Sequence, residues 1–391
     1  MLVGLFGWRG VFWFNMPFGV LCIAVTLLVV EDSADPGGRR VDLAGQALLA
    51  LTLAAGAYAV IEGNDLGWTS APILALFVLA AAAGLGFLAV ERAGASPAVR
   101  LDLFGDPTFT GANAVAFAIN FGVFAIFFFL SLFLQLIATY SAFQAAAHFA
   151  PMTLAMIVAA PLTGRLVARV GPRPPMVAGL VLAATGMLLT DAVLSPRVGF
   201  GQLGWSLPLI GIGFGMVLAP MTSAVMTSAP RERSGMAAAT TNASRQVGAL
   251  VGVAVLGALV DGRLTGQLTD ELRRLGLPPN FQRLVLDAVT HGTSPSSGRG
   301  AGGGGGLVAK VIATAENAFV AGLHTALVTG AVVLLAAALL ALLTVRGPAR
   351  PGHGGAPPGY GKRRIIGRNR GRGRGVTRRT GASVPVPSAP P

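Results

Sequence analysis

The sequence has few of the residues that form disulfides or hold metals. Cys22 is the only cysteine among 391 residues, so no internal disulfide can form. The four histidines are scattered and, with one cysteine, offer no metal-ligand spacing. The phosphate-binding pattern GxxxxGK[ST] is also missing, which argues against ATP-driven pumping by this chain. We therefore expect neither a metal nor another cofactor.

Charged residues are scarce too: they form 12% of the chain, against roughly 25% in a soluble domain. Hydrophobic residues make up 53%, and the mean hydropathy is +0.68. This composition predicts an all-α, multi-pass protein of the cell membrane. A window of about 19 residues predicts nine spans, at Val11–Val30, Leu43–Ile61, Pro72–Val90, Phe109–Ile137, Ala145–Val167, Pro175–Leu194, Trp205–Thr227, Thr241–Val260 and Ala318–Val345.

Arginines are unevenly shared between the short loops that join these spans. Ten of them lie in every second loop, whereas the alternate short loops contain only Arg197. The ten-arginine loops are 31–42, 91–108, 165–174 and 228–245. Short cytoplasmic loops carry the basic excess in membrane proteins. We therefore predict that Met1 lies outside the cell and that the C-terminus is cytoplasmic.

The last outer loop, 261–317, is far longer than the others. Leucines recur in it at helical spacing among charged residues, which predicts a surface amphipathic helix. They are Leu264, Leu268, Leu272 and Leu275. Residues 296–306, SSGRGAGGGGG, predict a flexible linker.

The C-terminal segment 346–391 is basic and rich in Gly and Pro, a composition typical of disorder. Its Arg-Gly repeats are compatible with nucleic-acid binding. A polybasic segment beside a membrane, however, attracts anionic lipid. We expect anionic lipid as its partner and no nucleic acid.

Two stretches resemble a known transporter family. GWRGVFWFNMPFG, near the start, resembles the family's join between its fifth and sixth helices. PRERSGMAAATTNASRQVGALVGVAVLGAL resembles its cytoplasmic turn and following helix, through Asn242, Arg245, Gln246 and Gly248. The family is the fourteen-helix drug:proton antiporter branch of the major facilitator superfamily.

A third stretch resembles the superfamily's signature inner loop, of the form G-x-L-a-D-R-x-G-x-R. Gly164, Arg169, Gly171 and Arg173 match it, while Ala168 replaces the acidic residue that helps to latch the family's inner gate. A short basic turn that follows the charge rule explains the arginines equally well.

The resemblance implies a partial major facilitator fold that begins at the family's sixth helix. Residues 1–42 would hold the last helix of the N-terminal half and a cytoplasmic loop, and residues 43–108 two linker helices. Residues 109–345 would form the C-terminal six-helix half. The implied function is efflux of small, hydrophobic or cationic compounds in exchange for protons. Two alternatives remain open: a truncated fragment without transport of its own, and a membrane scaffold. No nucleophile, metal or acid pair lies within a span, so we do not expect an enzyme.

Polar residues in the fourth span are candidates for the substrate pathway. Asn113 and Asn120 are seven residues apart and therefore share one helix face, and Gln135 lies near the span's outer end. Amides at lipid depth also hydrogen-bond to neighbouring helices. Both interpretations, cavity lining and interhelical bonding, remain open.

No span carries a charge at its centre. Asp191 lies three residues from the outer end of its span and His324 about six, and these are the only internal ionisable candidates. Location at the membrane interface explains each of them. A proton-driven exchanger needs an ionisable residue inside the membrane, so we expect that residues 1–391 alone do not couple transport to protons.

Overall fold

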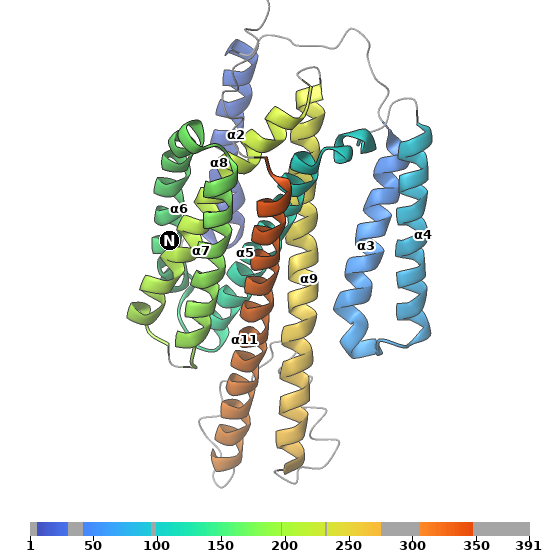
Figure 1. Ribbon diagram of the computed structural model, residues 1–391. Coiled ribbons are helices and arrows are strands. Elements are labelled where there is room, and N and C mark those ends of the chain that lie inside the picture. The colour runs from blue at the N-terminus through green and yellow to red at the C-terminus, as the bar shows by residue number, and fades with distance from the viewer. Residues whose placement is uncertain are drawn as a thin grey trace, which may run out of the picture. The chain divides into compact units, whose positions relative to one another are not determined.

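The computed structural model describes residues 6–29, 42–94, 99–196, 198–230, 233–274 and 305–346. The described part is helical (Figure 1) and contains nine helices that are long and apolar enough to cross a membrane. Three precede the main bundle: α2 (Arg9–Val29), α3 (Leu43–Leu66) and α4 (Ala71–Ala93). The short 3-10 helix η1 (Leu101–Gly105) leads into the rest, which are α5 (Pro107–Leu136), α6 (Ala142–Val170), α7 (Arg173–Val193), α8 (Phe200–Ser228), α9 (Ser234–Arg274) and α11 (Gly305–Thr344).

Several helix starts follow local chemistry that is visible in the sequence. Asp106 caps α5, where its carboxylate accepts hydrogen bonds from the backbone N–H groups of Thr108 and Phe109. Pro107 occupies the first helical position, where its missing N–H costs nothing. Ser141 and Gln144 form a capping box at the start of α6. These caps satisfy N–H groups that would otherwise have no partner at the helix ends.

Glycines bring the helices of the bundle into backbone contact. A Cβ on Gly248 or Gly252 of α9 would meet the carbonyl oxygen of Phe117 or Phe121 of α5. Gly211 of α8 lies in the same way against the carbonyl oxygen of Met152 in α6. Small residues at such spacing allow dispersion contacts in a solvent where no hydrophobic force drives helices together. The small-xxx-small pairs of α8 and α9 are therefore packing sites.

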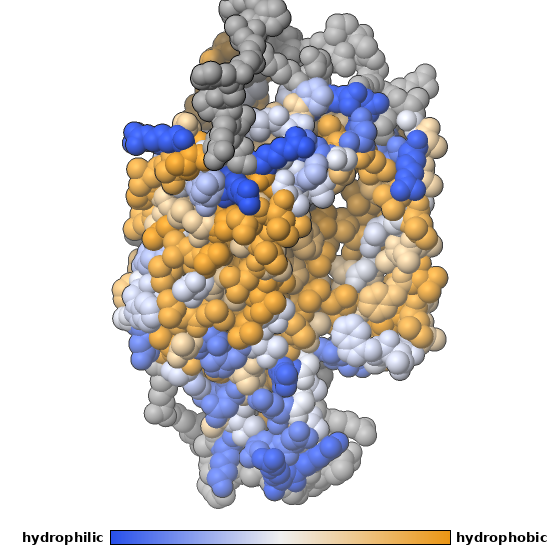
Figure 2. Space-filling view, in the orientation of Figure 1, coloured by the Kyte–Doolittle hydropathy of each residue, from blue (hydrophilic) through white to orange (hydrophobic). Residues whose placement is uncertain are grey.

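The helices α9 and α11 extend beyond the predicted spans. α9 continues to Arg274, and Leu264, Leu268 and Leu272 are buried along it, which confirms the predicted amphipathic helix for those residues. α11 begins at Gly305, so the linker prediction is wrong at residues 305 and 306. A hydropathy window ends where charges enter, whereas a helix continues as long as one face can pack. The two helices run side by side at their lower ends in Figure 1, and the coloured part of the same region in Figure 2 lies below the apolar band and is mostly hydrophilic.

The helices outside the bundle are much less enclosed. α3 and α4 pack on each other as a hairpin, and α3 also touches α9, where Asn64 donates its side-chain N–H to the carbonyl oxygen of Ala258 at 2.7 Å. Gly10 is the one buried residue of α2. Leu275, the remainder of the predicted linker and the predicted basic tail after Arg346 lie outside the described residues.

Candidate functional site

Asp191 and His324, 133 residues apart in the chain, form an ion-pair contact between two spanning helices. Asp191 lies in the last turn of α7 and His324 in α11, and the His324 Nδ1 to Asp191 Oδ1 distance is 2.5 Å. The side chains are 39% exposed for the histidine and 22% exposed for the aspartate, so both are partly shielded from solvent. The sequence singled out both residues but contained no signal that joins them.

A neutral hydrogen-bonded pair lies one residue away. Thr190 donates its hydroxyl to the backbone carbonyl of Gly186 at 2.8 Å, and its oxygen lies 3.1 Å from the Ser206 hydroxyl of α8. Both side chains are fully buried. Adjacent positions of α7 thus contact α11 through a titratable group and α8 through a neutral one. Only the contact with α11 can change its charge.

The three amides predicted for the substrate pathway occupy different environments. Asn113 is buried, donates to the Phe109 carbonyl at 2.8 Å, and accepts a hydrogen bond from the Ser244 hydroxyl of α9 at 3.2 Å. Asn120 is also buried and donates to the Ala116 carbonyl of its own helix. Gln135 is exposed and bonds to Ser131. Asn113 therefore links two helices, which is the bonding that the sequence analysis left open beside cavity lining.

The signature turn between α6 and α7 is built around Gly171. Its φ of 80° lies in the left-handed region, which favours glycine, and its N–H donates to the Val167 carbonyl at 2.9 Å. Arg169 is exposed in the last turn of α6, and Arg173 is the first residue of α7. Gly164 is exposed in α6, five residues before Arg169. Gly171 thus reverses the chain, and the two arginines lie on either side of it at the ends of α6 and α7.

Two ion-pair contacts at the same end of the bundle as the signature turn escaped the sequence analysis. Arg233, just before α9, contacts Asp102 of η1 at 2.8 Å, and Arg346 lies 3.8 Å from Asp106. The signal was opposite charge in loops predicted to share one side of the membrane. Because Asp102 is about half exposed, we expect its pair with Arg233 to stabilise the fold only modestly.

One residue of the α9 motif is packed against α5, and others are exposed. Gly248 is buried in the α5 contact, whereas Asn242 and Gln246 are exposed one turn apart on the same face. Arg245 is partly buried, and its Nε is buried without a hydrogen-bond partner among the described residues. Each motif residue therefore has a distinct location, although they are close in sequence.

Aromatic side chains of α5 leave an apolar surface on the bundle. Phe124 and Phe127 are 49% and 42% exposed. Phe124 packs on Phe214 of α8, and Phe127 packs on Phe149 of α6 with ring centroids 4.2 Å apart. An aromatic surface that is held by neighbouring helices can receive an apolar or cationic molecule through ring faces. It is a better candidate for substrate contact than the buried amides.

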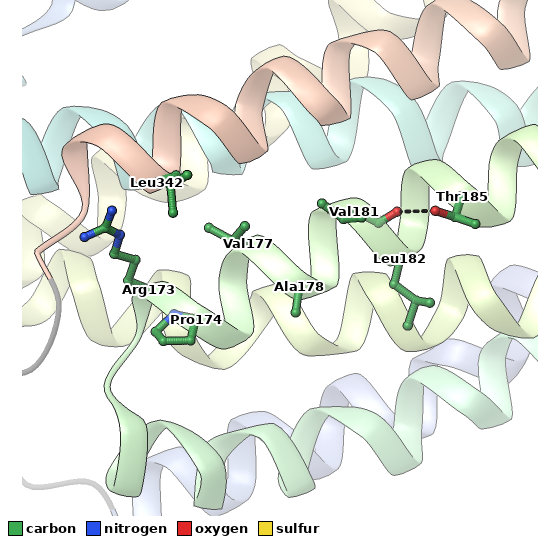
Figure 3. Close-up of a pocket in the computed structure, with 8 residues that line it drawn as sticks. All are labelled: Arg173, Pro174, Val177, Ala178, Val181, Leu182, Thr185 and Leu342. Carbon is green, nitrogen blue, oxygen red and sulfur yellow. Dashed lines mark hydrogen bonds between the residues drawn. The ribbon is translucent and has the colours of Figure 1, made fainter.

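A groove of about 680 Å³ follows the exposed face of α7 (Figure 3). Its lining is apolar except for Arg173 at one end and Thr185 near the other. The described residues contain no group of three or more His, Cys, Asp or Glu that could hold a metal ion.

Comparison with known proteins gives a consistent family. The Major Facilitator Superfamily matches residues 1–253. The multidrug resistance protein Stp of Mycobacterium tuberculosis is 33% identical over 355 residues, which cover 89% of this chain and 64% of that protein. The tetracenomycin C resistance and export protein of Streptomyces glaucescens is 28% identical and covers 88% of this chain and 64% of its own length. The chain thus spans less than two thirds of these relatives.

Among solved structures, a bacterial homologue of the human lysosomal transporter Spinster, in an inward-facing and occupied conformation, covers 77% of this chain and 66% of its own. Its sequence identity is 17% and its TM-score 0.44.

The family match covers more than half of the chain and includes the signature turn and the α9 motif. It confirms the resemblance drawn from those motifs, the all-α multi-pass membrane fold, and the expectation that the chain is not an enzyme. The chain belongs to the Major Facilitator Superfamily.

Proposed function

We propose that the complete protein exports small hydrophobic or cationic compounds across the cell membrane in exchange for protons. The relatives Stp and the tetracenomycin C export protein bear names of drug resistance and export, which supports the class of cargo. The observation that carries the proton part is the Asp191–His324 contact. Of the ion pairs among the described residues, it is the one that joins two spanning helices.

This contact provides a chemical means to hold and release a proton. When the pair holds one proton, the Asp191 carboxylate is negative and the His324 imidazolium is positive, so the two attract each other and join α7 to α11. A second proton neutralises Asp191 and leaves a cationic His324, so the attraction between the two helices is lost. Ionisable residues at membrane depth are costly and for that reason are commonly functional. Asp191 lies in the last turn of α7, and His324 lies six residues from the start of the predicted span Ala318–Val345. The pair is therefore toward the predicted outer side of the membrane, where protons would enter an exporter.

The cargo would contact the exposed aromatic side chains of α5. Phe124 and Phe127 offer ring faces that accept apolar surface and also attract a cation. The helices α5 to α11 would then form one half of a transporter whose two halves rock about a central substrate site, the motion general to such folds. The signature turn, with Arg169 and Arg173, would lie at the inner gate. Arg245 and Gln246 would hold the inner end of α9.

The test is transport in proteoliposomes with an imposed pH gradient and ethidium as a hydrophobic cationic probe. Residues 1–391, a chain extended upstream, and the Asp191→Asn variant of each are compared. Glu271→Gln is the matched control, because Glu271 forms an exposed ion pair with Arg274 within α9. We expect Asp191→Asn to abolish gradient-driven export and Glu271→Gln to leave it unchanged. Equal gradient-driven export by the extended wild-type chain and by its Asp191→Asn variant would contradict the role of the pair.

A fragment without transport of its own is the second candidate. The chain spans 64% of the length of Stp, which favours this alternative. It predicts no export by residues 1–391 and gradient-driven export by the extended chain. Export by residues 1–391 themselves would eliminate it.

A further inference from the structure

The groove on α7 has the shape of a shallow channel along one helix. Pro174, Ala178, Val181 and Thr185 follow one another on the exposed face of α7, and Leu342 of α11 forms the far wall. Figure 3 shows Arg173 at one end with its guanidinium toward Leu342. Residues on the opposite face of α7, such as Gly179 and Leu180, are buried in the bundle. The groove therefore opens away from the packed side of α7.

The groove has one charged residue, Arg173, and an otherwise almost entirely apolar lining. Thr185 uses its hydroxyl on the Val181 carbonyl at 2.9 Å (Figure 3), so it offers no free donor to a ligand. Arg173 forms no ion pair or side-chain hydrogen bond with any described residue. Pro174 and Pro175 have no N–H, so the first turn of α7 provides little for an anion apart from the guanidinium. The groove thus presents a single cation and an apolar channel.

The length of the groove corresponds to one leaflet of a bilayer. Residues 173 to 185 span about 18 Å at the helical rise of roughly 1.5 Å per residue. Half of the hydrocarbon core of a bilayer is about 15 Å. With Arg173 at the membrane edge, the channel runs from head-group level to about the mid-plane.

We propose that this groove is a binding site for an anionic phospholipid. The phosphate would accept hydrogen bonds from Arg173, whose planar guanidinium matches phosphate oxygens. One acyl chain would lie along Ala178 and Val181 and cover the junction of α7 with Leu342. The positive charge of Arg173 repels a cationic substrate, so the site differs from the aromatic surface of α5. In the predicted topology the lipid belongs to the cytoplasmic leaflet.

The test measures lipid retained by the full chain in native mass spectrometry, with phosphatidylglycerol and phosphatidylcholine added separately. Arg173→Gln removes the charge, and Ala178→Trp fills the channel. Arg92→Gln and Ala82→Trp are the matched controls, because both residues are exposed on α4, away from the groove. All variants keep the basic segment 346–391, so its lipid binding is common to every measurement.

We expect Arg173→Gln to weaken phosphatidylglycerol binding at least about tenfold, since a charge-assisted hydrogen bond to a net anionic lipid is lost. Phosphatidylcholine binding should weaken less, because the choline cation offsets the charge of its phosphate. Ala178→Trp should weaken the binding of both lipids, and the controls neither. Thr185→Phe is a second filling variant if Ala178→Trp does not fold. Wild-type phosphatidylglycerol binding by Arg173→Gln, or displacement of the lipid by ethidium, would overturn the proposal.

Discussion

The helices α4 and α5 are both strongly apolar, yet they differ sharply in how far the protein encloses them. Of the most apolar 18-residue window, 67% is buried in α5 and 11% in α4. Hydropathy identifies both as spans and does not distinguish them. The difference lies in what the neighbouring helices present to each.

The α5 helix is contacted closely by the backbone of α9 and by a polar side chain of that helix. Gly248 and Gly252 of α9 lie directly on its carbonyl oxygens, and Asn113 accepts a hydrogen bond from Ser244. A Cβ added to the glycines of α4 would meet only side chains at ordinary contact distance; on Gly86 it would lie 3.5 Å from the side chain of Leu48. In a membrane, close backbone approach and interhelical hydrogen bonds decide which apolar helices form a core.

The predicted membrane orientation of α4 and α5 can be tested with an all-or-none readout. We predict that single cysteines at Ser70 and Ser294 label from outside, and that those at Ser234 and Ser383 label only after permeabilisation, in a chain without Cys22. The reason is the concentration of arginines in alternate loops. Labelling is followed with a membrane-impermeant maleimide. The reverse pattern would show that α4 and α5 run opposite to the predicted directions.

The largest graded effect should come from the α5–α9 contact. Gly252→Ala places a methyl group on the Phe121 carbonyl oxygen and should lower the free energy of unfolding by about 1–3 kcal/mol. Gly56→Ala is the control, because its new methyl group would meet only the Ala80 Cβ at 3.8 Å. Unfolding in mixed micelles gives both values. A loss at Gly56 equal to that at Gly252 would remove the distinction between hairpin and bundle.

A smaller effect is expected from the hydrogen bond between Asn113 and Ser244. A double-mutant cycle with Asn113→Leu and Ser244→Ala should give a coupling energy of about 0.6 kcal/mol, the usual size for such bonds in membranes. The same cycle at Gln135 and Ser131, an exposed pair within α5, should give a value near zero. A zero coupling at Asn113 would leave glycine contacts as the main cause of α5 burial.

Local sequence patterns predicted the positions of the helices, but not the end of α9 or the start of α11. All nine predicted spans correspond to described helices, and Pro107 begins α5 as its position suggested. The end of α9 was placed too early and the start of α11 too late, because Asp270, Glu271, Lys310 and Glu316 lower the hydropathy of a window. Those charges can face water while Leu264 and Leu268 remain buried.

The sequence by itself determined the membrane class, the spans, and the motifs that mark the superfamily. These depend on composition and on residues near each other in the chain. Only the tertiary structure decided that Asp191 meets His324, that Asn113 bonds to Ser244, and that Arg173 caps a groove beside Leu342. Each of these joins residues more than 100 positions apart. Their meeting depends on which helix faces touch, and that is set by the summed packing of all the helices.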